Sequence, residues 1–136
     1  MERHQQINTG TSEAGGQLFG TVTPDVVRIL HATGPYHGDD RSRHRYRSAP
    51  QSAQLSITKE AERGRIYLGE WHTHAEGNPY PSRLDVDVME TILTRSKLNT
   101  TSLLLAIVGQ MPLPRSLCVW SFSKEGALKW SHVVTP

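Results

Sequence analysis

The stretch between Gly69 and Asp85 constrains this 136-residue chain more than any other. It contains the pair His72 and His74 in a His-x-His arrangement and, after seven intervening residues, a Ser-x-x-Asp pair formed by Ser82 and Asp85. Two imidazoles and a carboxylate are a ligand set for zinc, and three protein ligands leave the fourth tetrahedral position to water. That open position distinguishes catalytic from structural zinc, so the stretch predicts a hydrolase.

The spacing of the histidines fits one face of a strand. The run 66–71 reads as a strand, and side chains on a strand alternate between faces, so His72 and His74 are expected to project to the same side. The run 76–81 is rich in Gly, Asn and Pro and is therefore expected to turn the chain back towards the metal.

A helix is expected directly after this turn. Ser82 is a good N-cap for a helix over 83–97, in which Leu84, Val88 and Ile92 recur at helical spacing. Asp85 then lies in the first turn, near the histidines. As an isolated pair, Ser82 and Asp85 would be interpreted as a capping box in which the acid reaches back to the cap. The combination with two histidines favours a metal ligand.

These residues resemble the JAMM motif of the MPN (JAB) domain metalloproteases, the zinc isopeptidases that remove ubiquitin or ubiquitin-like proteins from their conjugates. The family also has a glutamate well upstream, beside a Gly-Gly-x-Leu-x-Gly strand. The run 12–20, Ser-Glu-Ala-Gly-Gly-Gln-Leu-Phe-Gly, supplies this glutamate as Glu13. The resemblance implies that His72, His74 and Asp85 hold one zinc ion per chain.

The resemblance also implies two catalytic roles. Glu13 would act as general base, taking a proton from the attacking water and delivering it to the departing amine. Ser82 would donate a hydrogen bond to the tetrahedral oxyanion, so its loss should slow chemistry more than it weakens metal binding. Glu70 and Glu76 flank the histidines and compete for the role of base, and Glu70 shares the strand parity of His72. We rank Glu13 first.

Two features depart from the family's pattern. Ala75 stands where many members have proline, which loosens the turn after the second histidine but removes no ligand. Only twelve residues precede Glu13, where the family usually has a strand and a helix. The sequence leaves open whether this short start is the natural one.

Length and composition predict a single domain over residues 1–136. This length is typical of one domain with one buried core, and a mean hydropathy of -0.48 is that of an ordinary soluble protein. The longest apolar run, 103–108, is too short to span a bilayer. The N-terminus lacks the apolar stretch of a signal peptide, and the single Cys118 cannot form an internal disulfide. We therefore expect a cytoplasmic protein without a membrane segment.

The order of the expected elements indicates the fold class. Strands are expected over about 16–22, 26–32, 66–71, 102–108, 117–123 and 127–134, helices over about 52–63 and 83–97, and a polar loop over 33–50. Residues 124–126 read as a hairpin turn between the last two strands. Helices interleaved with strands and a closing antiparallel hairpin predict an α/β domain with a mixed sheet. The resemblance implies the same architecture, a single MPN (JAB)-like domain with a curved mixed sheet flanked by helices.

The expected polar loop contains arginine at every second position from Arg41 to Arg47, around Tyr46. Such a segment can hold phosphates, can pair with an acidic protein partner, or can be a solvated loop, and its role stays open. A net charge of only +2 argues against a dedicated nucleic-acid binder, although the sequence pI is near 8.9.

The function implied by the resemblance is that of a zinc-dependent isopeptidase or peptidase. It would cleave after the C-terminal glycine of a ubiquitin-like protein, releasing it from a target lysine or from a C-terminal extension. The wording Glu-Trp-His-Thr-His resembles small stand-alone prokaryotic members, some of which work beside ubiquitin-like activating and conjugating enzymes in antiphage defence.

Two alternatives stay open. One is a peptidase that trims a sulfur-carrier protein to expose its Gly-Gly end. The other is a non-catalytic MPN-like module, either a scaffold or a RadC-like DNA-associated protein. An intact set of polar site residues favours a catalyst over a scaffold, because a buried polar cluster is costly. The absence of an appended DNA-binding helical region argues against the RadC-like alternative.

Overall fold

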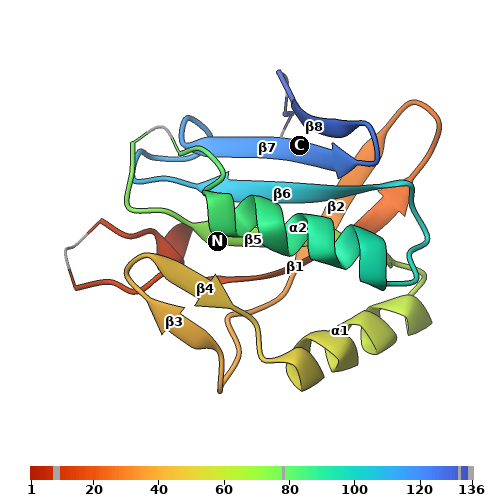
Figure 1. Cartoon of the computed structure of the whole chain (residues 1–136), viewed down its shortest axis with the longest axis horizontal. Helices are drawn as coiled ribbons and strands as arrows, with labels where there is room; N and C mark the ends of the chain where they lie inside the picture. Colours follow the sequence, from red (N-terminus) through yellow and green to blue (C-terminus); the bar gives the residue numbers. More distant parts are fainter. Residues whose placement is uncertain (8–9, 78, 132, 135–136) are drawn as a thin grey trace.

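In the part of the chain that the structure describes, the fold is a mixed sheet of six strands with two helices and a small separate hairpin (Figure 1). The computed structural model describes residues 1–7, 10–77, 79–131 and 133–134. In chain order the elements are the 3-10 turn η1 (Glu2–His4), β1 (Gly15–Val22), β2 (Val27–Ala32), β3 (Asp40–Ser42), β4 (Arg45–Arg47), α1 (Pro50–Glu62), β5 (Ile66–Thr73), α2 (Arg83–Arg95), β6 (Ser102–Val108), β7 (Leu117–Ser123) and β8 (Gly126–Lys129).

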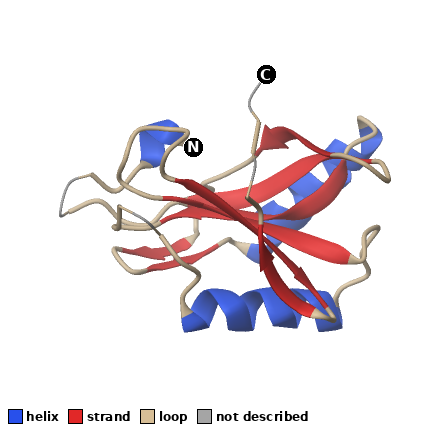
Figure 2. Cartoon of the chain, turned by 90° about the horizontal axis from the view of Figure 1, so that it is seen from above, coloured by secondary structure: helices blue, strands red, loops and turns tan. Residues whose placement is uncertain are grey.

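The main sheet has the strand order β2-β1-β5-β6-β7-β8. The central strands β5 and β6 are parallel and are joined through α2, whereas the other neighbours in this sheet are antiparallel. The strands twist markedly across the sheet (Figure 2). The predicted α/β class and mixed sheet are therefore confirmed.

The apolar core occupies both faces of the sheet. Strand β6 is buried on both faces, because Leu103, Leu105 and Ile107 alternate with Leu104 and Ala106. One face packs under α2, where the buried cluster consists of Met89, Leu103, Leu105, Ile107 and Phe122. The cluster on the other face consists of Ala14, Leu18, Leu68, Trp71, Leu104, Ala106 and Val119. No helix in the described ranges is long and apolar enough to cross a bilayer.

Strand β5 is irregular at Gly69, three residues before His72. Gly69 has φ +150, and a Cβ atom there would lie 1.9 Å from the carbonyl oxygen of Leu104 on the neighbouring strand. The register between β1 and β5 shifts at this point, since Leu18 is opposite Gly69 and Phe19 is opposite Tyr67. Only glycine permits this backbone geometry and close approach. Beyond Gly69, β5 continues through His72 to Thr73, and His74 follows the end of the strand.

The segment 33–50 is the main difference from the predicted elements. It was expected to be a polar loop, but it contains the two-stranded hairpin β3–β4, in which Arg41 pairs with Tyr46. Asp39 stabilises the hairpin, because its carboxylate accepts from the Tyr46 hydroxyl at 2.6 Å and from the Ala49 amide at 2.7 Å. These strands have no apolar face, so the usual alternation of apolar and polar residues was absent.

The remaining boundaries differ by a few residues. Helix α1 begins at Pro50, where proline is favoured in the first turn, rather than at Ser52. The strand expected over 127–134 is observed only as Gly126–Lys129, and position 132 lies outside the described residues.

Candidate metal centre

The two histidines meet at the end of β5. His72 is in the strand and His74 follows it, and their rings stack with centroids 4.8 Å apart. Their Nε2 atoms lie 3.0 Å from each other. Both residues are buried, with 7% and 6% of their surface exposed. The strand alternation therefore places both imidazoles on one side, as the sequence predicts.

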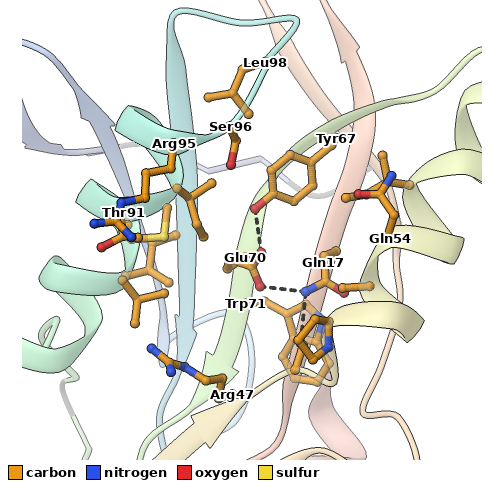
Figure 3. Close-up of a pocket in the computed structure, with 18 of the residues that line it drawn as sticks. Gln17, Arg47, Gln54, Tyr67, Glu70, Trp71, Thr91, Arg95, Ser96 and Leu98 are labelled. Carbon is orange, nitrogen blue, oxygen red and sulfur yellow. Dashed lines mark hydrogen bonds between the residues drawn. The ribbon is translucent and has the colours of Figure 1, made fainter.

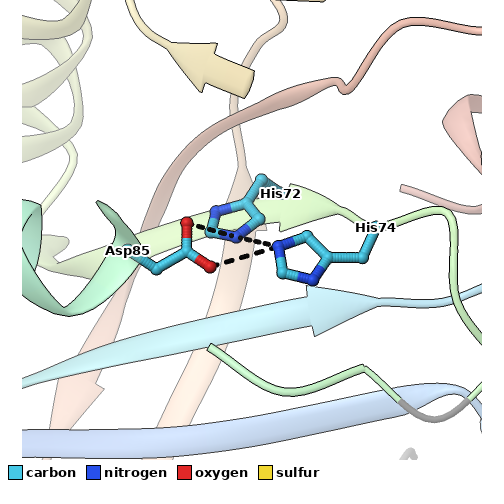
Figure 4. Close-up of side chains that lie close together, drawn as sticks. All are labelled: His72, His74 and Asp85. Carbon is cyan, nitrogen blue, oxygen red and sulfur yellow. Dashed lines mark hydrogen bonds and ion pairs between the residues drawn. The ribbon is translucent and has the colours of Figure 1, made fainter. Parts of the chain in front are cut away.

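Asp85 completes the cluster from the first turn of α2 (Figure 4). Its Oδ1 lies 3.2 Å from Nε2 of His72, and its Oδ2 lies 3.1 Å from Nε2 of His74. The ligand atoms of the three residues all lie within 4.8 Å of one another. Two elements that are separate in the sequence thus bring two nitrogens and a carboxylate to one point.

The electrostatics of the cluster match its geometry. Burial alone would raise the pKa of the Asp85 carboxyl, but hydrogen bonds from His72 and His74 outweigh it and hold this pKa well below its usual range. Burial opposes protonation of His74, yet the hydrogen bond to Asp85 raises the pKa of this imidazole above its ordinary value. The site therefore favours an ionised carboxylate and positive charge beside it.

This arrangement fits a zinc ion. In a tetrahedral site with bonds of about 2.0–2.1 Å, neighbouring ligand atoms are about 3.3–3.4 Å apart. The Nε2 atoms of His72 and His74 are 3.0 Å apart, and they lie 3.2 and 3.1 Å from Oδ1 and Oδ2 of Asp85, each distance within a few tenths of an ångström of that edge. With one oxygen of Asp85 taken as the ligand, the three ligand atoms lie within 4.8 Å of one another. The donor set of two imidazoles and one carboxylate also leaves one tetrahedral position for water or substrate.

Glu13 lies beside the cluster, just before β1. Its Oε1 is 4.0 Å from Nε2 of His74, and only 6% of the residue is exposed. Burial raises the pKa of Glu13 to about 7, although the positive charge of His74 opposes this shift. A carboxyl with a pKa near neutrality is suited to accepting and releasing a proton.

Ser82 caps the helix that carries Asp85. Its Oγ accepts a hydrogen bond from the Asp85 amide at 3.1 Å, and Oδ2 of Asp85 accepts one from the Ser82 amide at 2.7 Å. The capping box that the sequence suggests is therefore present, and the same aspartate also faces the histidines. The Ser82 hydroxyl hydrogen remains able to donate, since only the oxygen is used in the cap.

The two competing carboxylates differ in their surroundings. Glu70 accepts from the Tyr67 hydroxyl at 2.5 Å and from Nε2 of Gln17 at 2.8 Å (Figure 3). The Glu70 carboxylate is therefore bonded to side chains of β5 and of the neighbouring strand β1. Glu76 is exposed in the turn after the strand. The ranking of Glu13 above both rests on its distance from His74.

A cavity of about 840 Å³ lies between α1 and α2 and leads to the cluster. Its floor is β5 with Tyr67 and Glu70, and Arg47 and Arg95 stand at its sides (Figure 3). Further along, His72 and Asp85 form part of its lining. An extended chain in this groove would reach the cluster with one end.

Three residues around the site were not singled out for these contacts from the sequence. The side chain of Thr73, which stands between the two histidines in the sequence, faces away from them. Its hydroxyl accepts a hydrogen bond from the Ala14 amide at 2.9 Å. The buried amide of Gln6 lies 3.3 Å from the same hydroxyl. Arg41 donates from Nε to the backbone oxygen of Glu13 at 2.7 Å. The alternating arginines singled out the segment that contains Arg41, but nothing in the sequence indicated that Arg41 bonds to Glu13.

Comparison with protein-family models gives a match to the family described as prokaryotic homologs of the JAB domain, over residues 3–120. Among curated proteins, the chain is similar to one called CD-NTase/cGAS isopeptidase from Pseudomonas aeruginosa, with 40% identity over 88 residues, 62% of this chain and 56% of the relative. A protein of the same name from Vibrio cholerae is 32% identical over 110 residues, 79% of this chain and 68% of the relative.

The chain spans between 56% and 68% of the lengths of the curated relatives it matches. Among solved structures, the solution structure of protein DSY2949 from Desulfitobacterium hafniense superposes with a TM-score of 0.63. The match covers 98% of this chain and 83% of that protein at 19% identity, which supports the fold alone.

Proposed function

Because the chain belongs to the prokaryotic JAB-domain family, we propose that it is a zinc-dependent isopeptidase that separates a protein from its conjugate. One observation carries the proposal. Nε2 of His72, Nε2 of His74 and the carboxylate of Asp85 converge within 4.8 Å, the histidines buried and the aspartate partly buried, with Glu13 beside them. A bound zinc ion would supply a Lewis acid that makes water a nucleophile at neutral pH.

The side chains of the chain itself would then carry the proton and hold the substrate. Glu13 takes the proton of the attacking water and delivers it to the nitrogen of the departing amine. Its raised pKa, about 7, suits both directions of this transfer. Ser82, at the N-terminus of α2, donates its hydroxyl hydrogen to the oxyanion that develops on the attacked carbonyl.

The groove between α1 and α2 supports a substrate with an extended end. A C-terminal tail lying over β5 would place its last carbonyl near His72 and Asp85. A substrate amine from a lysine or from a following residue would leave on the other side. We propose that the tail belongs to a ubiquitin-like protein or to a CD-NTase.

The names of the relatives favour the second of these substrates. Proteins called CD-NTase/cGAS isopeptidase share 40% and 32% identity with this chain. We therefore take a CD-NTase conjugate as the first substrate to test. We also propose a role in antiphage defence beside activating and conjugating enzymes, which the resemblance of the Glu-Trp-His-Thr-His run to small prokaryotic members implies. A ubiquitin-like protein, or a sulfur-carrier protein with a C-terminal extension, is the second.

The experiment is a cleavage assay with three substrates. These are a CD-NTase joined through its C-terminus to a lysine, a ubiquitin-like protein joined in the same way, and a sulfur-carrier protein with a C-terminal extension. Cleavage that stops with a chelator and returns with zinc supports the proposal, and the preferred substrate identifies the class. If none is cleaved and the protein instead shifts DNA at physiological salt, the RadC-like alternative is favoured.

A further inference from the structure

The backbone of Glu13 lies just beyond the residues through which β1 pairs with β5. The last contacts between the β1 and β5 segments are made by the residue before β1, since the Thr73 amide donates to the Ala14 oxygen at 2.8 Å and Thr73 Oγ1 accepts from the Ala14 amide at 2.9 Å. Glu13 is one residue further out and has no partner in the ladder. Its position must come from elsewhere.

The hairpin β3–β4 supplies the missing contacts. The Glu13 amide donates to the Ser42 oxygen at 2.6 Å, and the Glu13 oxygen accepts from Nε of Arg41 at 2.7 Å. Both backbone polar groups of Glu13 are therefore bonded to the same strand, β3. A hydrogen bond from a guanidinium is among the stronger ones in proteins, because the donor is charged.

The hairpin is itself held firmly enough to act as a support. Asp39 accepts from the Tyr46 hydroxyl, and the Tyr46 ring lies over Gly15, where an added Cβ would come within 2.6 Å of it. Gln6, which is completely buried, donates from Nε2 to the Arg43 oxygen at 2.7 Å and to the Thr11 oxygen at 2.9 Å. The hairpin and the segment before Glu13 are thus joined at several points.

We propose that Arg41 is a positioning residue for the general base, and that this is a role of the arginine-rich hairpin. By fixing the carbonyl of Glu13, Arg41 fixes the distance of the Glu13 carboxylate from the metal centre, now 4.0 Å from His74. A displacement of about 1 Å at such a group can cost about a hundredfold in rate. The predicted effect of Arg41 on catalysis rests on the proposed function, whereas the contact between Arg41 and Glu13 does not.

The experiment replaces Arg41 by Ala and by Lys, with Arg45→Ala as the matched control. Arg45 is in the same hairpin, but its side chain is half exposed and pairs with exposed Asp40 at 3.0 Å. Because Arg41 is exposed at the surface, its removal leaves no buried cavity. The readouts are zinc content, kcat and KM on the cleaved conjugate, and hydrogen exchange of amides 11–15.

The expected result is a fall in kcat of at least about tenfold in Arg41→Ala, with KM and zinc content unchanged. Amides 11–15 should exchange faster in this variant, and Arg41→Lys should recover part of both effects because its ammonium can still donate one hydrogen bond. Arg45→Ala should match the wild type in every readout.

Two results would overturn this inference, and both differ from the result that would reject the proposed function. If the wild type cleaves the conjugate and Arg41→Ala does so with the same kcat, Arg41 does not position the base. If exchange of amides 11–15 is unchanged, the contact does not hold the segment, whether or not the wild type is active. Absence of cleavage by the wild type together with faster exchange in Arg41→Ala would instead reject the isopeptidase proposal and leave the structural contact in place.

Discussion

Asp85 accepts a hydrogen bond from the Ser82 amide at 2.7 Å while the same oxygen lies 3.1 Å from Nε2 of His74. One carboxylate therefore both caps the N-terminal end of α2 and forms part of the metal centre. This explains why the two interpretations of the Ser-x-x-Asp pair, helix cap and metal ligand, do not exclude each other. The cap fixes the rotation of the carboxylate that the metal would use.

Replacement of Asp85 by Asn should separate the two roles. The amide oxygen can still accept from Ser82, so α2 should keep its first turn, but the negative charge at the site is lost. We expect the affinity for zinc to fall by on the order of a hundredfold or more, because changes outside the ligand shell alone cost about 10–100-fold. Titration with a competing chelator measures it, with Asp87→Asn on the exposed face of the same helix as the control. Equal affinities in the two variants would remove Asp85 from the ligand set.

Ser82→Gly should lower kcat without unfolding the helix. Glycine at an N-cap costs only a few tenths of a kcal/mol relative to serine, whereas loss of one oxyanion donor costs about 100–1,000-fold in kcat. Zinc content should be unchanged. Ser82→Thr keeps both the cap oxygen and the hydroxyl hydrogen and should retain most activity. A Ser82→Gly variant with the kcat of the wild type would mean that the hydroxyl only caps α2.

Gly69→Ala should destabilise the protein strongly. The new Cβ would lie 1.9 Å from the Leu104 oxygen at a backbone φ of +150, so β5 and β6 must move apart. We expect a loss of more than about 2 kcal/mol in the free energy of unfolding. Gly77→Ala is the control, since a Cβ there has nothing within 4 Å, and its effect should stay within about 0.5 kcal/mol. Denaturant unfolding of both variants checks this, and equal stabilities would contradict the close approach of the two strands.

Glu70 should make stability depend on pH. Burial raises the pKa of Glu70 to about 7 from an ordinary value of 4.5, although its hydrogen bonds from Tyr67 and Gln17 oppose the shift. The folded state therefore favours the protonated form. This contribution to stability is fully present below about pH 4.5 and is lost as the pH rises through 7.

The free energy of unfolding should consequently fall less in Glu70→Gln than in the wild type as the pH rises from about 5 to about 7.5. The slope of unfolding free energy against pH is the readout, because the new amide would face the Gln17 amide and change the absolute value. A chelator in all samples prevents metal binding from adding its own pH dependence. Exposed Glu90→Gln is the control, and parallel curves for wild type and Glu70→Gln would contradict the raised pKa.

The sequence predicted much of the fold and the cluster for identifiable reasons. Period-2 alternation placed His72 and His74 on one face, and the N-cap pattern placed Asp85 in the first helical turn, where the structure has it. Both are local rules that act over a few residues. The long apolar strands such as β6 and the helix boundaries near Arg83 were readable for the same reason.

The parts that could not be predicted depend on contacts between distant segments. The hairpin β3–β4 has polar residues on both faces and depends on the Asp39 side chain and on Gln6, which is far from it in sequence. The bond from Arg41 to Glu13 spans 28 positions. The register shift at Gly69 depends on how closely β6 approaches, which no local pattern records.

The central claim is tested most directly by zinc content and cleavage measured on the same samples of wild type, His74→Ala and Glu13→Gln. The account predicts one zinc per chain in the wild type and in Glu13→Gln, none in His74→Ala, and conjugate cleavage by the wild type alone. A wild-type protein that takes up no zinc after metal reconstitution, or a Glu13→Gln variant that cleaves as fast as the wild type, would contradict it.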